Sequence, residues 1–503
     1  MKSKSIKILL MGAAITSMLS SCGDSWFERE PKNILTNELV WNDPNMIKSQ
    51  LANLYNRIPQ LHGDFNTGGM CETDDAMYCG TLDQNYRNEL RYGNDYGRWW
   101  DYGLIRDINM SIENIDKYGT DISADEKLQF KAEFRFIRAY VYFELVRRMG
   151  GVPLITKSLT AEEAQQVTRA SYDDCMKQII ADCDTAANRL PEQYKGSSES
   201  VGFDDKKELG RPTTGSAYGL KSRALLYWAS PLNNPNNDKQ RYKLAIDAAQ
   251  KVVESAFRYK LMAFTDEDET FTDLYAVSEN FLQYHREIVF STKYNTTTSV
   301  ESQNSPLTMG GKGLTNPTQN LADAFGMANG KGINELGSGY DKDHPYVGRD
   351  PRFYMTFAYD GSTFTVNDKT QTIETFEGGK DATATNKTAT KTGYYLKKLL
   401  SPQAVWDGRT NNITRTWILM RYAEVLLNCA EAMNEYYDTP SAAPKDSIYK
   451  VVELIRKRAQ LNPHKLPTGL SKEEMREVIR NERRVELAFE EHRFFDIRRW
   501  RLL

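Results

Sequence analysis

The sequence predicts a mostly α-helical protein, in which tetratricopeptide-like helix pairs form a scaffold and a large loop-rich half carries a few short strands. Several segments place apolar residues at the three- and four-residue spacing of an amphipathic helix. Small residues such as Ala217, Ala224, Ala245 and Ala249 recur where paired helices would pack. By contrast, long stretches at 59–97, 295–350 and 359–392 are rich in Gly, Asn, Asp or Thr, and such long loops are often functional.

The helical pattern is strong enough to locate individual helices. They are expected at 126–149, 217–227, 242–252, 418–433, 451–458 and 471–490. Gly150 and Gly151 end the first of these, and Ser471 with Glu474 has the spacing of a capping box that opens the last. Short strands are expected at 287–292 and 353–359, so the helices form the scaffold and the loops form an irregular face.

The N-terminus has the pattern of a secretory signal. Lysines in the first seven residues precede an apolar stretch at 8–19, which is shorter than the ~20 residues that span a bilayer. Leu19-Ser20-Ser21-Cys22 then resembles the lipobox of bacterial lipoproteins. Residues 1–21 are therefore expected to be removed and Cys22 to carry the lipid anchor, while a plain signal peptide with a chance cysteine is the alternative.

Charge and cysteine content exclude some classes of protein. The net charge of −3 becomes more negative once the signal-peptide lysines leave, which does not fit a nucleic-acid binder. Cys71 and Cys79 could pair within one loop, with free thiols as the alternative. The sequence holds no HExxH, Walker-type or GxSxG motif, so no enzyme class is indicated.

Several motifs, in order along the chain, resemble the SusD/RagB family. They lie at 132–153, 316–330, 350–352, 421–432 and 482–500. The resemblance implies one SusD-like domain over 22–503, with an N-terminal part at about 22–230 and a C-terminal part at about 280–503. Members usually continue for some dozens of residues beyond the position of Trp500, so a short member and a C-terminal truncation both stay open.

The resemblance also implies a function. Such proteins are lipid-anchored at the cell surface on the outer membrane, where they capture oligosaccharide or polysaccharide and deliver it to a SusC-like TonB-dependent transporter. They are not enzymes and need no cofactor. A peptide-capturing, RagB-like protein is one alternative, and a surface glycoside hydrolase is another.

Aromatic residues in the loops are the candidate glycan-binding groups, because rings stack on sugar faces while polar neighbours bond the hydroxyls. The first long loop supplies Asp75, Tyr78, Tyr92 and Tyr96, and the later loops supply Tyr294 and Tyr346. The competing interpretation is that these side chains only pack the loops. Trp99 and Tyr102 stand at helical spacing before an apolar helix and are assigned to the core.

Acidic residues are expected to be structural. Glu482, Glu486 and Glu490 lie four apart on a predicted helix, where Arg480, Arg483 and Arg484 can pair with them. An ion network is favoured over acid–base catalysis, and the same holds for Glu424 and Glu431. The run Asp266–Glu269 is expected to be a solvated loop, with a weak calcium site as the alternative.

Overall fold

The computed structural model describes most of the chain. The described residues are 35–59, 70–80, 100–194, 208, 210–255, 259–263, 286–292, 295–406 and 413–503. The expected signal peptide, Cys22 and the acidic run Asp266–Glu269 lie outside these ranges, so their roles stay predictions. Within the described ranges, no helix is both long and apolar enough to cross a bilayer.

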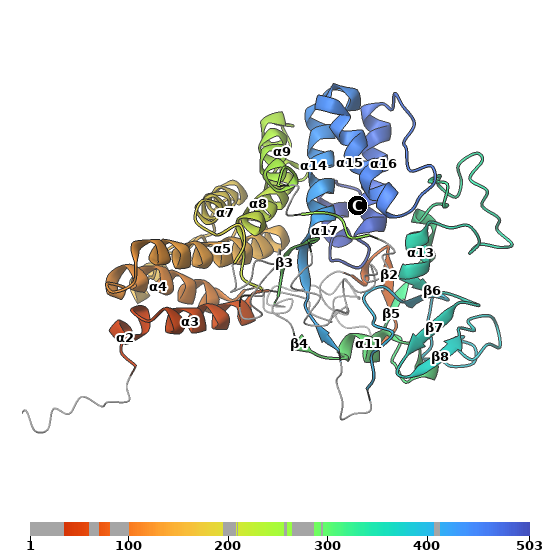
Figure 1. Cartoon of the computed structure of the whole chain (residues 1–503), viewed down its shortest axis with the longest axis horizontal. Coiled ribbons are helices and arrows are strands. Elements are labelled where there is room, and N and C mark those ends of the chain that lie inside the picture. The colour runs from red at the N-terminus through yellow and green to blue at the C-terminus, as the bar shows by residue number, and fades with distance from the viewer. Residues whose placement is uncertain are drawn as a thin grey trace, which may run out of the picture.

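The N-terminal half is a stack of helices that runs across Figure 1 from the red end toward the green. Its helices are α2 (Asn37–Trp41), α3 (Pro44–Arg57), α4 (Tyr102–Tyr118), α5 (Ala124–Met149), α6 (Ala161–Gln165), α7 (Tyr172–Ala187), α8 (Thr214–Ala229) and α9 (Lys239–Val253). Each long helix packs on the next, in the order α4, α5, α7, α8 and α9, which confirms the predicted scaffold of paired helices.

Local sequence explains where these helices begin and end. Ser123 and Glu126 form a capping box at the start of α5, and Gly150 follows its last residue with a φ of +73°. Asp101 and Asp238 cap α4 and α9 in the same way, through side-chain oxygens that accept backbone N–H groups. Polar caps and turn residues therefore set the helix lengths, and apolar faces decide which helices pair.

The C-terminal helices extend the stack, because α14 packs against α9 and then against α15 and α16. They are α14 (Tyr422–Tyr436), α15 (Ser447–Arg458), α16 (Lys472–Glu486) and α17 (Arg493–Arg499). The predicted capping box of Ser471 and Glu474 is present. The prediction that the helix begins at 418 was wrong, because Ile418–Arg421 forms a strand that pairs with β3 (Ile288–Ser291), and the helix begins only after it. Helix α16 ends at Glu486 rather than near 490.

The other half is built from short strands, short helices and loops, in the centre and on the right of Figure 1. Its strands are β1 (Glu72–Thr73), β2 (Ala76–Tyr78), β3 (Ile288–Ser291), β4 (Asn295–Thr296), β5 (Thr315–Pro317), β6 (Phe357–Ala358), β7 (Thr363–Val366), β8 (Lys369–Thr372), β9 (Tyr395–Leu396), β10 (Thr414–Arg415) and β11 (Ile418–Arg421). Its short helices are α11 (Ser299–Asn304), α12 (Gln319–Ala324) and α13 (Pro351–Thr356), with 3-10 turns at Leu307–Met309, Pro440–Ala442 and Pro444–Asp446.

These strands form small antiparallel sheets. One sheet has the order β1-β2-β5, and the pairs β4 with β10, β3 with β11, β6 with β9 and β7 with β8 complete the set. The strand expected at 287–292 is confirmed as β3. The strand expected at 353–359 was mostly wrong: Asp350 caps a helix over Pro351–Thr356, and only Phe357–Ala358 is extended.

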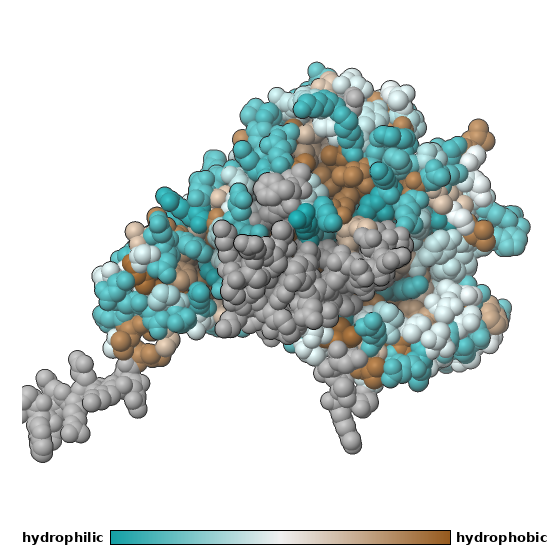
Figure 2. All heavy atoms as spheres, viewed as in Figure 1, coloured by the Kyte–Doolittle hydropathy of each residue, from teal (hydrophilic) through white to brown (hydrophobic). Residues whose placement is uncertain are grey.

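Each half has its own hydrophobic core. The first core follows the helix stack, and the second lies under the loop-rich half around Phe325, Phe353, Phe357 and Tyr395. On the face shown in Figure 2 the described surface is mostly hydrophilic, and its hydrophobic residues gather in separate patches. The loops therefore rest on a packed base, which can hold surface side chains in fixed positions.

Candidate functional site

The structure places three of the six candidate glycan-binding residues. Tyr92, Tyr96 and Tyr294 lie outside the described residues, as does Trp99. The other three, Asp75, Tyr78 and Tyr346, occupy different environments and are taken in turn. Tyr102, assigned to the core, does pack against the first hydrophobic core, and its hydroxyl donates to the carbonyl oxygen of Pro153 at 2.7 Å.

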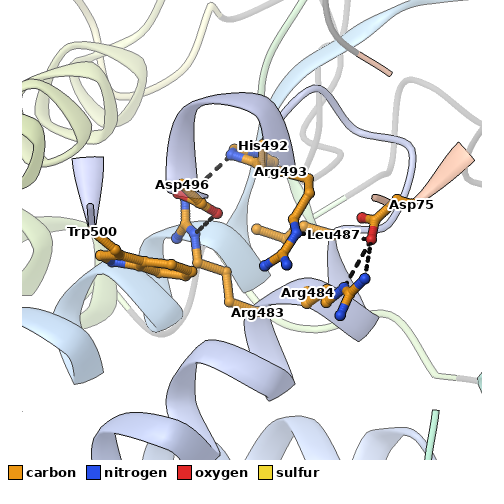
Figure 3. A pocket seen from close by; sticks show the side chains of 8 residues that line it. All are labelled: Asp75, Arg483, Arg484, Leu487, His492, Arg493, Asp496 and Trp500. Atoms are coloured by element: carbon orange, nitrogen blue, oxygen red, sulfur yellow. Dashed lines mark hydrogen bonds and ion pairs between the residues drawn. The ribbon is translucent and has the colours of Figure 1, made fainter. Parts of the chain in front are cut away.

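Asp75 is buried, with 4% of its surface exposed, and it belongs to an ion cluster. Its Oδ1 lies 2.6 Å from Nη2 of Arg484 and 3.8 Å from Nε of Arg493, and Figure 3 shows its side chain pointing toward Arg484. The cavity beside it has a volume of about 10 Å³, which is room for a single water molecule. Asp75 therefore has a structural role, and we leave it out of the candidate site.

The neighbouring Asp74 completes this cluster. It accepts two hydrogen bonds from Arg493, at 2.7 and 2.8 Å, and one from Arg484 at 3.1 Å. Partial burial alone would raise the pKa of Asp74, but the hydrogen bond from Arg493 and the charge of Arg484 lower it below its usual value. The cluster ties the turn between β1 and β2 to the C-terminal helices.

Tyr78 lies at the end of β2, opposite Thr315 of β5. The next residue, Cys79, places its thiol 3.2 Å from the carbonyl oxygen of Ala389, and no disulfide joins Cys71 to Cys79. Strand β5 leads directly into α12, whose first residue, Gln319, lines the pocket described next. Tyr78 therefore lies on a strand that pairs with β5, and β5 leads to Gln319 in the pocket that contains Tyr346.

Tyr346 lines an open pocket with a volume of about 280 Å³, near the lower end of the range for small-ligand sites. The pocket lies in the loop-rich half, where segments distant in the sequence meet. It is lined by Gln319, Tyr346, Asp360, Thr375, Phe376, Thr392, Gly393 and Tyr394. These side chains are aromatic or hydrogen-bonding, which is the composition that the sequence argument associates with sugar recognition.

The aromatic rings of the pocket support one another. The ring of Tyr346 lies 4.3 Å from that of Tyr359 and packs edge-on against that of Tyr394, with a centroid distance of 6.3 Å. Its other neighbour is Phe353, at 6.1 Å in a stacked arrangement. Phe376 differs from these, because 55% of its surface is exposed at the rim. The pocket therefore has two rings held by their neighbours, Tyr346 and Tyr394, and one exposed ring, Phe376.

Hydrogen bonds fix the polar groups. Backbone N–H groups of Thr375 and Phe376 donate to Oδ1 of Asp360, at 2.8 and 3.2 Å. The phenol of Tyr394 donates to Oε1 of Gln319 at 2.8 Å. Burial raises the pKa of the phenols of Tyr346 and Tyr394, so they stay neutral hydrogen-bonding groups at neutral pH.

Most of the residues that line this pocket were not predicted from the sequence. Only Tyr346 was predicted, while Asp360, Phe376 and Tyr394 were not. Phe376 follows the β7–β8 hairpin, and a lone aromatic residue in a Gly- and Thr-rich loop was the one available signal. Asp360 and Tyr394 carried no signal of their own, because only the fold brings them together.

The C-terminal glutamates are structural, as predicted, but with different partners. Glu482 pairs with Arg352 at 2.6 Å, and Glu490 pairs with Lys398 and Arg421 at 2.8 and 2.6 Å. The expected partners are used elsewhere: Arg480 with Glu477, Arg483 with Asp496, and Arg484 with Asp74 and Asp75. The glutamates thus bind arginines and a lysine from other elements rather than from their own helix.

Glu424 and Glu431 are also held in buried pairs, with Arg223 and Arg499 respectively. Trp500 adds a hydrogen bond to Glu431 at 2.7 Å. Within the described part of the chain, no group of three or more His, Cys, Asp or Glu residues is placed to hold a metal ion.

Two family models match the chain. A model described as the SusD family matches residues 281–503, and one described as "Starch-binding associating with outer membrane" matches residues 26–226. SusD-like protein P2 from Formosa agariphila is 26% identical over 82% of this chain and 74% of its own length. SusD-like protein P38 from the same organism is 23% identical over 99% of this chain and 91% of its own length.

Solved structures show the same architecture. A SusD-like protein from Bacteroides fragilis matches with a TM-score of 0.74 and 27% identity, covering 92% of this chain and 87% of its own. A second protein of that organism, described as a SusD-like carbohydrate binding protein, also has a TM-score of 0.74, at 23% identity over the same shares of the two chains.

A helix stack that supports a loop-rich half with an open, aromatic pocket is the architecture of a ligand-binding protein. The two family models together span both halves, and the solved structures share the whole arrangement. The chain belongs to the SusD/RagB family, as its motifs indicated.

Proposed function

We propose that the protein is a non-enzymatic lipoprotein that captures carbohydrate at the cell surface and delivers it to a SusC-like TonB-dependent transporter. Lipid on Cys22 would hold it to the outer membrane. Family membership supports this assignment, as does the relative described as a SusD-like carbohydrate binding protein. The single observation that carries the proposal is the pocket at Tyr346, with its open aromatic rim and bonded polar groups.

The pocket supplies both kinds of contact that a sugar needs. Phe376 offers an exposed apolar face to the C–H side of a sugar ring. Asp360, Thr375 and Thr392 offer oxygen atoms to its hydroxyl groups. Because the pocket is open to water, each contact recovers only part of the cost of binding, and affinity per site is expected to be modest.

Capture without cleavage is favoured over hydrolysis. A glycosidase uses two carboxyl groups that flank the scissile bond. Among the described residues that line the pocket, Asp360 is the one carboxylate. The C-terminal glutamates do not supply a partner, because they are held in buried ion pairs with arginine and lysine.

The test is isothermal titration calorimetry of the chain from Gly23 onward against plant, fungal and host polysaccharides, followed by the Phe376→Ala variant. Phe376 has 55% of its surface exposed. Covering it should contribute about 1 to 1.5 kcal/mol, so the variant should raise Kd roughly tenfold. Leu244→Ala is the control, since Leu244 is an exposed apolar residue on α9, in the helix stack.

Each outcome has a clear meaning. Binding to one class of glycan that weakens in Phe376→Ala, but not in Leu244→Ala, supports capture at this pocket. Binding that both variants keep would leave the function standing and move the site to other loops. No binding to any glycan, with binding to a peptide library, would replace the proposal by peptide capture.

A further inference from the structure

Asp360 is the one charged side chain among the described residues that line the pocket. Asp360 contributes a negative charge, and the other described lining residues are aromatic, hydroxyl-bearing, an amide or a glycine. An aspartate side chain is ionised at neutral pH, so a second anion brought into the pocket would meet a like charge. No cation among the described lining residues offsets it.

Several basic side chains flank the lining segments in the sequence, and three of them, Lys380, Lys391 and Arg349, have the following partners. Lys380 pairs with Glu374 at 3.3 Å, and Nζ of Lys391 donates to the carbonyl oxygen of Lys387 at 2.5 Å. Arg349 lies over the ring of Phe353. It donates to the backbone carbonyl oxygens of Ala322, Phe325, Gly326 and Pro345.

The carboxylate of Asp360 is the acceptor-only group of the described pocket lining, whereas the hydroxyls of Thr375 and Thr392 can donate or accept. Both backbone bonds to Asp360 end on Oδ1, so Oδ2 keeps its lone pairs for a ligand. The hydroxyl proton of Tyr394 is donated to Gln319 and is not available to a ligand. An ionised carboxylate can only accept, so the ligand group that contacts Asp360 must donate a hydrogen bond, which sugar hydroxyls do and carboxylates or sulfates do not.

We infer that this pocket selects neutral, hydroxyl-rich sugars and discriminates against sugars that carry a carboxylate or sulfate, with Asp360 as the residue that sets this preference. The inference rests on the proposed function of the same pocket. An anionic group about 6 Å from Asp360, in the mixed dielectric of an open pocket, should weaken binding by about tenfold.

The experiment compares matched ligands. Neutral gluco-, manno-, galacto- and xylo-oligosaccharides are first titrated by calorimetry, and one is chosen whose binding weakens in Phe376→Ala. The primary hydroxyls of this oligosaccharide are then oxidised to carboxylates, which adds charge and keeps the sugar chain and its linkages. If the chosen ligand is a pentose chain, whose repeating units lack primary hydroxyls, it is sulfated instead. The wild-type chain should bind the charged form at least tenfold more weakly than the neutral one.

The Asp360→Asn variant tests the residue. Asparagine keeps an oxygen for the N–H groups of Thr375 and Phe376 but removes the charge. It replaces the acceptor Oδ2 by an NH2 donor, so it should weaken binding of the neutral ligand, but it should shrink the neutral-to-charged ratio to about threefold or less. Asp125→Asn, at an exposed position in the first turn of α5, makes the same charge change in the helix stack and should leave the ratio unchanged.

Equal binding of the neutral and charged ligands by wild type would overturn the inference while leaving glycan capture intact. Preference for a uronate or sulfated glycan, or a ratio that Asp360→Asn does not change, would overturn it as well. If no glycan of either kind binds, the proposed function fails together with the inference.

Discussion

Replacing Glu486 by Gln should destabilise the protein strongly. Glu486 is buried and is contacted by three arginines: Arg421 at 2.7 Å, Arg352 at 3.1 Å, and Arg458 in a closer contact. Glutamine keeps the volume of the side chain and one acceptor oxygen but removes the charge. Removing one partner of a buried ion pair typically costs about 3–5 kcal/mol, so a loss of about 3 kcal/mol is expected.

The dependence on pH follows from the same contacts. Burial alone would raise the pKa of Glu486, but the charges of Arg458, Arg421 and Arg352 hold it well below its usual value. The unfolded chain therefore takes up this proton first as the pH falls. The stabilisation is complete above the unfolded pKa of about 4.3 and is lost as the pH falls through the lower native value.

Urea unfolding at pH 7, followed by far-ultraviolet circular dichroism, measures the effect. Glu473→Gln is the matched control, since Glu473 lies in the first turn of the same helix with 74% of its side chain exposed. Its loss should stay below about 0.5 kcal/mol. A Glu486→Gln protein within 1 kcal/mol of wild type, at an equal urea dependence, would refute the view that this charge anchors the fold.

Two further predictions concern His492 and Asp74. Burial and the charge of Arg483 hold the pKa of His492 well below its usual value, so the unfolded chain is protonated first and stability should fall between pH 7 and pH 5. In thermal melts the His492→Gln variant should lose less stability than wild type over that interval. An equal loss in the two proteins would contradict this prediction. Asp74→Asn should lower the free energy of unfolding in urea by about 1 kcal/mol, because Asp74 and its partners Arg493 and Arg484 lie at a partly exposed site where solvent screens their charges. A decrease above about 3 kcal/mol would contradict this screening argument.

Sequence reasoning succeeded where structure is local. Helix α5 was predicted to within two residues of its start, because its apolar spacing and its terminal glycine both lie within one stretch of chain. It failed where pairing is distant. Ile418 continues the helical pattern of α14, but its backbone pairs with Ser291 of β3. No sequence pattern near residue 418 indicates this strand pairing.

The same limit applies to the pocket. Tyr346 could be proposed because aromatic residues in polar loops are informative on their own. Asp360 and Tyr394 could not, since an aspartate and a buried tyrosine are common in loops and acquire a role only beside each other. Asp75 shows the reverse error: it stood in the right kind of loop, but its charge is used by Arg484 in the protein interior.

The charged C-terminal motif is best understood as a support for the pocket. Lys398 follows Tyr394 and β9 in the chain and donates to Glu490 and to the carbonyl oxygens of Glu486 and Ala488. Arg352, on α13, pairs with Glu482 and Glu486.

Hydrophobic contacts between the two halves would tolerate small sliding movements, whereas charge-assisted hydrogen bonds require one geometry. The motif therefore holds α13 and β9 against the C-terminal helices, and with them the loops that carry Tyr346 and Tyr394. This arrangement gives the glutamates a positioning role for binding without any contact with the ligand. It also explains why such an acid-rich helix end is fully paired in the interior instead of lining the pocket.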